Sequence, residues 1–588
     1  MKFFIHLSTV IVFVFFAFYF FSCKGKESEL NKKNNELYLK GLQPGKDVNN
    51  VFSPEGQVAS CDSILALPGY PESKKQIVVF VKAVNLLYLG RENEAIQFLE
   101  GIIGKNTIND QPKLMNDVRK YLALAYQRLG ERNNCVSNHT SSSCIFPIQG
   151  KGIYSDTMAS SNSIKIYEEI LKQNPNDLES KWLLNIVFMT LGQYPKKVPS
   201  ALLIPDLDKD PSSYHVKPFE NIASGLNLND FRNMAGGSIV DDFNNDNYLD
   251  IITSAWGLDE GMHYFRNNKD GSFTDVSKES GLSNIKGGLN IIQADYNNDG
   301  YTDILVLRGA WWREFGKQPN TLLKNNGDGT FADVTVESGI LSFHPTQTAT
   351  WADFNNDGWL DLFIGNETVS KEYPHPSELF INNQNGTFTE EAAASGCQII
   401  GFTKGVTSGD YNNDGWTDIF ISDLTGKKRL LKNKGLNSKI PQFTDITHEA
   451  GFDKDPSSTF PTWFWDYNND GWPDIFICGY QYNGSLGVIS AAEALKLPAE
   501  NPSRMYLYRN NHDGTFSDVS VSAGLNKAVF AMGSNFGDID NDGWLDMYLG
   551  TGNPDLKSLV PNRLFKNIGG QKFADVTYSS RTGNLQKG

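Results

Sequence analysis

The chain has 588 residues, of which 40% are apolar, and it carries a formal net charge of −15. This length is too great for one hydrophobic core, so two or three domains are expected. Because no basic stripe offsets the negative charge, the composition argues against a nucleic-acid partner.

The first 22 residues predict a targeting segment that is not part of the fold. Lys2 is followed by an apolar stretch rich in Phe and Val, which ends in Phe20-Phe21-Ser22-Cys23. A small residue directly before a cysteine resembles a bacterial lipobox, although Phe20 stands where Leu is commoner. Cleavage would leave Cys23 as a lipidated N-terminus. We therefore expect an exported bacterial outer-membrane lipoprotein, on its periplasmic or cell-surface side, that meets the membrane only through this anchor; a plain signal anchor is the alternative.

Residues 23–75 begin with the polar run KGKESELNKKNNELYLK and predict a tether. Residues 76–200 show a helical pattern that repeats. Its first copy is VVFVKAVNLLYLGRENEAIQFLEGII, and its last contains an Asn-Pro turn between two helices. The pattern resembles tetratricopeptide helix pairs, in which neighbouring hairpins bury each other's apolar stripes. We expect either a concave docking surface for a partner or a helical cap that only packs on the next domain.

Two cysteines lie close together in the helical region. Cys135 and Cys144 flank the polar run VSNHTSSS, and in an exported protein they would close a short disulfide; two free thiols are the alternative. Cys397 and Cys478 occupy apolar repeat positions and are expected in the core.

Six near-copies of one acidic loop follow: DFNNDNYLD, DYNNDGYTD, DFNNDGWLD, DYNNDGWTD, DYNNDGWPD and DIDNDGWLD. Oxygen ligands at positions 1, 3, 5 and 9, with a backbone carbonyl at position 7, suit Ca²⁺, which takes about 6–8 oxygen ligands. The loops therefore predict about six structural calcium ions, although solvated turns are the alternative. The predicted side-chain ligands are Asp242, Asn244, Asp246 and Asp250; Asp295, Asn297, Asp299 and Asp303; Asp353, Asn355, Asp357 and Asp361; Asp410, Asn412, Asp414 and Asp418; Asp466, Asn468, Asp470 and Asp474; Asp538, Asp540, Asp542 and Asp546. The position-7 carbonyls belong to Tyr248, Tyr301, Trp359, Trp416, Trp472 and Trp544.

An EF-hand needs a helix after the loop, whereas each loop here precedes an apolar, β-prone run such as ILVL or LFIG. Glycine at position 6, present in five loops, permits a sharp turn, so the first loop, with Asn247 there, should bind most weakly. Recurrent aromatic residues at position 7 are expected to pack between repeat units. Because a β-prone run follows each loop, the loops are expected to be turns between strands.

The loop units recur every 53–72 residues, and each opens with a Phe-x-Asp-Val-like strand, beginning at Phe219 and recurring last at Phe573. Four short strands per unit predict an all-β propeller over residues 215–588. The units resemble FG-GAP/VCBS repeats, which also form the propeller of integrin α-subunits. Longer strings, such as FPTWFWDYNNDGWPD and GDIDNDGWLDMYLGTGNPDL, resemble the family of proteins similar to cartilage acidic protein, which often ends in an ASPIC/UnbV domain.

Lys286-Gly287 and Lys404-Gly405 each lie 6–9 residues before a loop, and the chain ends at Lys587-Gly588. This register predicts six full loop units and the start of a seventh, in a propeller that stops short of its last blade.

Outside the loops the sequence contains no HExxH, GxSxG or phosphate-binding motif, so we expect a protein that is not an enzyme. The irregular loop GAWWREFGKQPN offers Trp311, Trp312 and Arg313 as a stacking platform for a sugar or peptide, with packing between blades as the alternative. The expected function is a calcium-binding scaffold for protein or glycan partners. A glycan-active lyase or hydrolase built on the propeller is the alternative.

Overall fold

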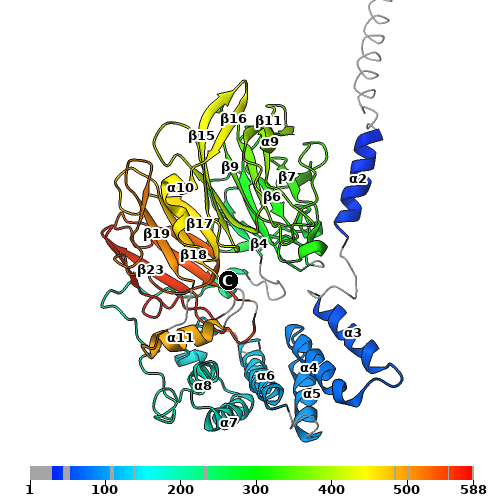
Figure 1. The fold of residues 1–588 in the computed structure, drawn as a ribbon, viewed down its shortest axis with the longest axis vertical. Helices are drawn as coiled ribbons and strands as arrows, with labels where there is room; N and C mark the ends of the chain where they lie inside the picture. The colour runs from blue at the N-terminus through cyan, green and yellow to red at the C-terminus, as the bar shows by residue number, and fades with distance from the viewer. Residues whose placement is uncertain are drawn as a thin grey trace, which may run out of the picture.

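The computed structural model describes residues 29–43, 53–105, 111–136, 140–228, 236–257, 260–481, 485–498, 503–553 and 555–585. The predicted targeting segment and Cys23 lie outside these residues. Helices form the N-terminal part of the structure, and small sheets arranged around a ring form the larger remainder (Figure 1).

Seven helices belong to the N-terminal part among the described residues. They are α2 (Glu29–Gly41), α3 (Pro54–Leu65), α4 (Glu72–Tyr88), α5 (Glu92–Lys105), α6 (Pro112–Glu131), α7 (Met158–Gln173) and α8 (Leu178–Thr190). Each helix from α3 to α7 packs on the next one along the chain. Local signals set the helix starts: the Asp177 carboxylate accepts a hydrogen bond from the Ser180 amide (3.1 Å), and so caps α8. The predicted helical region is confirmed.

Two of these helices lie within residues 23–75, where the sequence predicts a tether. On α2, Tyr38 is buried, and its hydroxyl lies 2.6 Å from Thr321 Oγ1 and 2.5 Å from Asp333 Oδ2 on the propeller. On α3, Val58 and Cys61 are buried. The tether prediction is wrong for residues 29–41 and 54–65, because a few well-spaced apolar residues give these polar helices a packing face.

Six four-stranded antiparallel sheets follow, each with its strands in chain order. We refer to them as blades 1 to 6. Blade 1 contains β1 (Ser238–Asp241), β2 (Asp250–Thr253), β3 (His263–Asn267) and β4 (Phe273–Asp275). Blade 2 contains β5 (Asn290–Ala294), β6 (Asp303–Leu307), β7 (Thr321–Asn325) and β8 (Phe331–Asp333). Blade 3 contains β9 (Thr346–Ala352), β10 (Asp361–Asn366), β11 (Glu378–Asn382) and β12 (Phe388–Glu390).

Blade 4 contains β13 (Thr403–Gly409), β14 (Asp418–Asp423), β15 (Arg429–Asn437) and β16 (Ile440–Asp445). Blade 5 contains β17 (Thr459–Trp465), β18 (Asp474–Gly479), β19 (Met505–Asn510) and β20 (Phe516–Asp518). Blade 6 contains β21 (Ala531–Gly537), β22 (Asp546–Thr551), β23 (Arg563–Ile568) and β24 (Lys572–Asp575). The short helices α9 (Ala392–Ser395) and α10 (Thr447–Ala450) follow blades 3 and 4, and α11 (Leu486–Ala494) lies within blade 5.

The blades are held together by apolar layers between neighbouring sheets. The first strand of each blade contacts the first strand of the next, from β1 through to β21. Between blades 3 and 4, for example, Phe354, Leu379 and Ile421 belong to one buried cluster. Every residue of β6, β10, β14 and β18 is buried, because a neighbouring blade covers each face of these strands. The predicted all-β propeller is confirmed, with six blades.

The Phe-x-Asp segments close each sheet and do not open it. Phe331, for instance, lies in β8 and pairs with Asn325 of β7 across a tight hairpin. In the same way Phe573 belongs to β24, the fourth strand of blade 6. The prediction that this segment starts a seventh unit is therefore wrong. The short turn before each segment pairs it with the preceding strand, and the sequence repeat by itself does not reveal that pairing.

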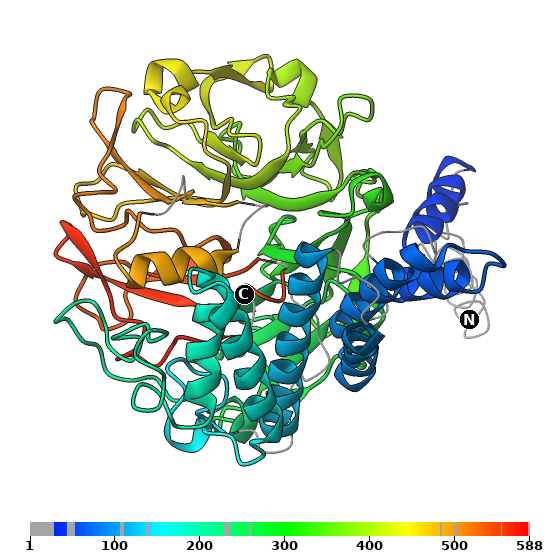
Figure 2. The same ribbon diagram turned by 60° about the horizontal axis from the view of Figure 1, so that its bottom comes forward.

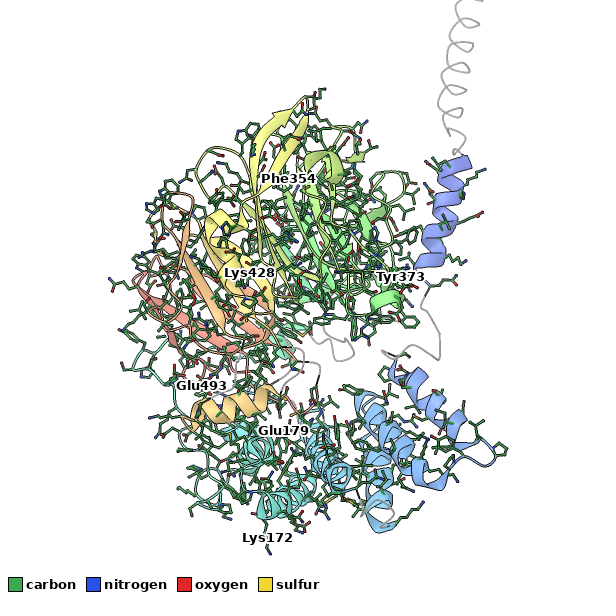
Figure 3. All side chains as sticks on the ribbon, in the orientation of Figure 1. Lys172, Glu179, Phe354, Tyr373, Lys428 and Glu493 are labelled. Atoms are coloured by element: carbon green, nitrogen blue, oxygen red, sulfur yellow. The ribbon has the colours of Figure 1, made fainter. Side chains whose placement is uncertain are left out.

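One apolar core joins the helical region to the propeller. It contains Phe146, Trp182 and Phe188 from the helical region together with Phe460 and Phe530 from the propeller. Helix α11 lies beside α8 in both views (Figures 1 and 2). Glu179, at the start of α8, is on the side that faces the propeller, whereas Lys172 is on the far side (Figure 3).

A segment of blade 6, which we call the clasp (residues 555–560), lies against the helices. Leu556 packs on the apolar cluster of α4 to α6, and the Leu559 carbonyl accepts a hydrogen bond from Trp182 Nε1 (2.7 Å). Lys557 Nζ lies 3.5 Å from Glu179 Oε1 and 5.5 Å from the ring centroid of Tyr121. The chain's own clasp thus covers part of the helical surface, which favours the predicted cap over a free docking surface.

Among the described residues, no helix has both the length and the apolar character needed to span a membrane.

Candidate metal centres

Each acidic loop connects the first strand of a blade to the second. In blade 3 the loop leaves β9 after Ala352 and enters β10 at Asp361, its position-9 residue. The other five loops have the same arrangement, and their position-9 residues are the first residues of β2, β6, β14, β18 and β22. The prediction that the loops are turns between strands is confirmed.

Backbone hydrogen bonds fold each loop around its own carboxylates. In the third loop, the Asp353 carboxylate accepts hydrogen bonds from the amides of Asp357 (3.0 Å) and Gly358 (2.8 Å), and Asn355 Oδ1 also accepts from Asp357 (3.0 Å). Positions 4 and 6 are left-handed, with φ of 55° at Asn356 and 86° at Gly358. Asn247, which replaces glycine in the first loop, also has a positive φ, of 66°. The loop therefore requires φ > 0 at position 6, as the sequence predicts.

The position-9 aspartates are buried at the base of the loops. Asp361 Oδ1 accepts a hydrogen bond from the Asn382 amide (2.8 Å), and its Oδ2 accepts one from the Phe354 amide (3.1 Å). Burial raises the pKa of Asp361 to about 7 and that of Asp418 to about 8, because a low-dielectric surrounding disfavours the ionised carboxylate. A cation beside these groups would favour the ionised form.

Two tests indicate that the loops fit a hard cation. Asp303 Oδ2 and Asp474 Oδ2 are buried and have no hydrogen-bond partner within the described part of the chain. In the sixth loop, carboxylate oxygens of Asp538, Asp540 and Asp542 lie within 4.8 Å of one another. Oxygens around one Ca²⁺ lie about 2.3–2.6 Å from the ion, so opposite ligands are about 5 Å apart. The donor atoms of the loops thus suit Ca²⁺, and the carboxylates of the sixth loop have a spacing that fits it.

Basic side chains from the third strand, or from the hairpin after it, approach position 5 of the loops. Lys324 Nζ lies 3.1 Å from Asp299, Lys432 Nζ lies 3.1 Å from Asp414, and His512 Nε2 lies 3.2 Å from Asp470. Lys566 Nζ contacts both Asp540 and Asp542 in the sixth loop. These groups offset part of the carboxylate repulsion. Sequence reasoning missed them, although runs such as LLKNNGDG carry them at a fixed place in the repeat.

Asparagines join each loop to the neighbouring blade. The side chain of the position-4 asparagine donates to the position-6 carbonyl of the next loop, as Asn356 does to Gly415 (2.9 Å). The same bond runs from Asn245 to Gly300, Asn298 to Gly358, Asn413 to Gly471 and Asn469 to Gly543. The six loops therefore form one hydrogen-bonded series.

A second set, the hairpin asparagines, lies at or near the end of the third strand in most blades, and within β15 in blade 4. Asn382 Nδ2 donates to the Tyr296 carbonyl of the preceding blade (2.8 Å) and to the Leu360 carbonyl (3.0 Å). Equivalent bonds to the preceding blade are made by Asn325, Asn433, Asn510 and Asn567. Figure 3 labels Phe354, whose carbonyl accepts such a bond from Asn433. Their recurrence in strings such as LLKN and LFIN was the signal that could have found them.

The position-7 aromatic residues pack on their own blade. Trp472 stacks on His512 of the same blade at a ring-centroid distance of 4.8 Å. Tyr301, Trp416 and Trp544 lie over the hairpin glycines Gly327, Gly435 and Gly570, so closely that a Cβ there would come within 3.1 Å of a ring atom. The sequence predicts packing between blades, whereas these four residues contact the hairpin of their own sheet, which curls over the loop.

The predicted stacking platform is not exposed. Trp312 is buried against Trp256, with their rings edge to face at 5.7 Å. Trp311 is half-buried and stacks on Phe460 of blade 5 (5.7 Å). Arg313 alone of the three is exposed. The packing alternative is therefore correct for both tryptophans, because the loop folds inward across the ring.

Cys135 and Cys144 are free thiols here, with Sγ atoms 3.2 Å apart, which corresponds to the second alternative given by the sequence. Cys397 and Cys478 are buried, as expected for core positions.

A six-bladed ring with one acidic loop per blade places the structure among the repeat-built β-propellers. A family profile described as "FG-GAP-like repeat" matches residues 242–306, 310–364, 366–421 and 466–549. The chain therefore contains FG-GAP-like repeats, and the matched ranges include all six loops.

The chain is similar to cartilage acidic protein 1 of Mus musculus and of Homo sapiens, with 24% identity over 299 residues in both cases. The match covers 49% of this chain and 42% of each relative, so the chain spans less than half the length of these curated proteins. The chain also has a likeness to the crystal structure of the V. cholerae biofilm matrix protein Bap1, with 13% sequence identity. That match covers 48% of this chain and 39% of that chain, and its TM-score of 0.27 is too low to support an inference. An FG-GAP propeller of this kind is consistent with a binding or scaffold module.

Proposed function

We propose that this chain is a calcium-stabilised binding and scaffold module of the bacterial cell envelope, held at the membrane by a lipid on Cys23. The observation that carries the calcium assignment is the repeated donor set: each of the six loops has carboxylate or amide oxygens at positions 1, 3 and 5 and a buried carboxylate at position 9. Oxygen donors in this number and flexibility suit Ca²⁺ better than Mg²⁺, which keeps several of its waters.

The role of calcium in this proposal is structural. Asp353 and Asp357 would supply carboxylate oxygens and Asn355 an amide oxygen, with Asp361 completing the set from β10. A bound ion would offset the repulsion among these carboxylates. Because Asn356 bonds the next loop, ordering one loop also supports its neighbour. Six such sites would hold the blade edges in register and leave the remaining surface to bind partners.

The proposed partners are proteins or glycans that bind the propeller loops. The clasp and the shared core attach the helical region to the propeller, which supports a single rigid platform. The proposal assigns the protein no reaction. The alternative is a glycan-active lyase or hydrolase. Incubating the full chain with glycan and peptide panels separates the two: if products form, and a substitution outside the acidic loops abolishes their formation, an enzyme replaces the binding proposal.

Metal analysis of the purified full chain tests the calcium assignment. We expect about six Ca²⁺ per chain after dialysis against trace calcium, and fewer than three tightly held ions would contradict the proposal. Asp466→Ala should remove one ion, because it deletes the position-1 ligand of the fifth loop. Asp453→Ala is the matched control, since this exposed aspartate lies on the turn after α10, outside every loop.

A further inference from the structure

The inner strands of all six blades enclose a cavity of about 540 Å³. Its wall includes one residue from the first strand, or its immediate neighbour, in each blade: Ser238, Asn290, Thr348, Val406, Thr462 and Ser534. This volume falls within the range of about 300–1,000 Å³ that is usual for small-molecule sites. Asn535 and Phe536 also line the cavity and are exposed, so it opens to solvent beside β21.

The loop after β6 closes one side of the cavity. Trp311 starts from blade 2 but stacks on Phe460 of blade 5 and contacts Phe402 of blade 4, so it crosses the ring. Its backbone amide donates to Glu367 Oε2 of blade 3 (2.9 Å). Trp311 also packs against the core shared with the helical region, so it lies between the cavity and the helices.

The cavity wall carries no uncompensated charge. Lys404 is the one charged residue among the described residues that line it. Its ammonium is fully buried, paired with Glu367, and 3.1 Å from the ring centroid of Trp311. Burial lowers the pKa of Lys404 to about 8, and the adjacent Glu367 partly offsets this effect. Because the acid and the base neutralise each other, the site offers no net charge to attract an ionic ligand.

Polar side chains line this neutral space. Ser534 is partly exposed and Asn535 is exposed. Asn535 Oδ1 accepts a hydrogen bond from the Phe536 amide (2.8 Å), and this bond does not use the Nδ2 donor of Asn535. Beside them, Phe536 is 37% exposed and packs on the buried Trp463 with ring centroids 5.5 Å apart, so Phe536 supplies the open aromatic surface. Amide and hydroxyl groups beside aromatic faces suit a ligand that has hydroxyl groups on its edge and C–H groups on its face.

We propose that this central cavity binds an uncharged saccharide of one or two sugar units. The proposal rests on the function proposed above, since it names the ligand class and the place where a glycan partner would bind. The neutral Lys404–Glu367 pair gives acidic sugars no electrostatic advantage over neutral ones, and the exposed wall residues beside β1 and β21 mark where the cavity opens to solvent.

A cavity-filling variant tests the proposal in the full chain. Gly533 lies in the wall, and a Cβ added there would meet nothing within 4 Å, so we expect Gly533→Leu to be accommodated and to reduce the cavity volume. Gly101 on α5 has equally open surroundings and lies outside the cavity, so Gly101→Leu is the matched control. Asn535→Ala is a second variant at an exposed position that removes one donor and does not threaten folding.

The probes are glucose, maltose, cellobiose and lactose, with glucuronic acid and cellobiuronic acid as charged counterparts, measured by calorimetry and saturation-transfer NMR on calcium-loaded protein. We expect at least one neutral sugar to bind, with at least a tenfold loss of affinity in Gly533→Leu, a smaller loss in Asn535→Ala and no change in Gly101→Leu. Binding of none of the neutral sugars, stronger binding of the acidic ones, or undiminished binding in Gly533→Leu would overturn the proposal. The calcium content of the same samples distinguishes this failure from failure of the proposed function.

Discussion

At the scale of single residues, the repeat depends on short polar side chains that local sequence rules treat as turn formers. The hairpin asparagines show this best. Asn382 is buried, donates to two carbonyls and accepts from the Gln384 amide (2.9 Å), whereas the adjacent Asn383 is exposed and bonds only within its own hairpin. Two neighbours of identical type therefore differ in whether they connect blades 2 and 3.

Asn382→Ala should lower the free energy of unfolding by about 1–3 kcal/mol, because it leaves buried carbonyls without a donor. Guanidinium denaturation in saturating calcium measures the change. Asn383→Ala should change stability by no more than about 0.5 kcal/mol. Equal decreases in the free energy of unfolding of the two variants would show that the hydrogen bond between blades does not stabilise the fold.

The first loop should gain calcium affinity in Asn247→Gly, because glycine adopts the required positive φ without the strain of a side chain. The gain should be up to about 1 kcal/mol. Gly300→Asn in the second loop is the reciprocal change and should weaken that loop by a similar amount. Calcium titration calorimetry checks both. If neither variant changes the affinity of the most weakly bound calcium ions, the backbone conformation at position 6 does not limit calcium affinity.

At the scale of elements, contacts between distant segments decide the arrangement. Trp182 on α8 is 2% exposed, and its indole Nε1 donates to the Leu559 carbonyl, 377 residues away in the sequence. This bond and the Lys557–Glu179 pair hold the clasp against the helices. Nothing in the local sequence of residues 555–560 indicates that partner.

Trp182→Phe keeps an aromatic ring but removes the donor, so it should cost about 0.5–1.5 kcal/mol and speed amide exchange in the clasp. Trp312→Phe is the matched control, because the buried Nε1 of Trp312 has no hydrogen-bond partner in the part of the chain that the structure describes. Hydrogen exchange read by mass spectrometry gives the answer for both. Unchanged exchange in residues 555–560 of Trp182→Phe would mean that packing alone holds the clasp.

At the scale of the whole molecule, the acidic loops sit at one end of each blade and are bonded to one another in series. If they bind calcium as proposed, removing the ions should loosen the ring as a unit. Each ion that binds only the folded chain adds about 2.7 kcal/mol at a hundredfold excess over its Kd.

Chelation should therefore lower Tm and speed exchange in all six loops, while α5 to α7 change little and serve as the internal control. Restoring Ca²⁺ should reverse the effect, and the same concentration of Mg²⁺ should not. An unchanged Tm after chelation would contradict a structural role for calcium.

The proposed anchor can be tested in a bacterial host. Cys23→Ala should move the protein from the membrane fraction to the soluble fraction, because the lipid is attached to that thiol. Cys135→Ala leaves the lipobox intact and should fractionate like the unaltered chain. Equal membrane retention of Cys23→Ala would refute the lipoprotein assignment.

The sequence by itself determined the features that repeat or that have a local period. The spacing of Asp and Asn predicts the loops, the apolar runs after them predict the buried second strands, and the 3.6-residue periodicity predicts helices α4 to α8. These signals are local, because each depends on backbone geometry within a few residues. The same reasoning assigned the Phe-x-Asp strands to the wrong blade, since a repeat in sequence does not say where one sheet ends.

Only the tertiary structure decided what the loops and helices contact. The sequence left open whether Trp311 is a surface platform or packs between blades, and the structure shows that it crosses the ring to Phe460. Tyr38 of the predicted tether reaches Thr321 over 283 residues. The burial of Asp361 and the pairing of Lys404 with Glu367 likewise depend on neighbouring blades. Such contacts form because the ring of sheets brings together residues whose sequence separation leaves no local pattern, and burial then determines which polar groups must find partners.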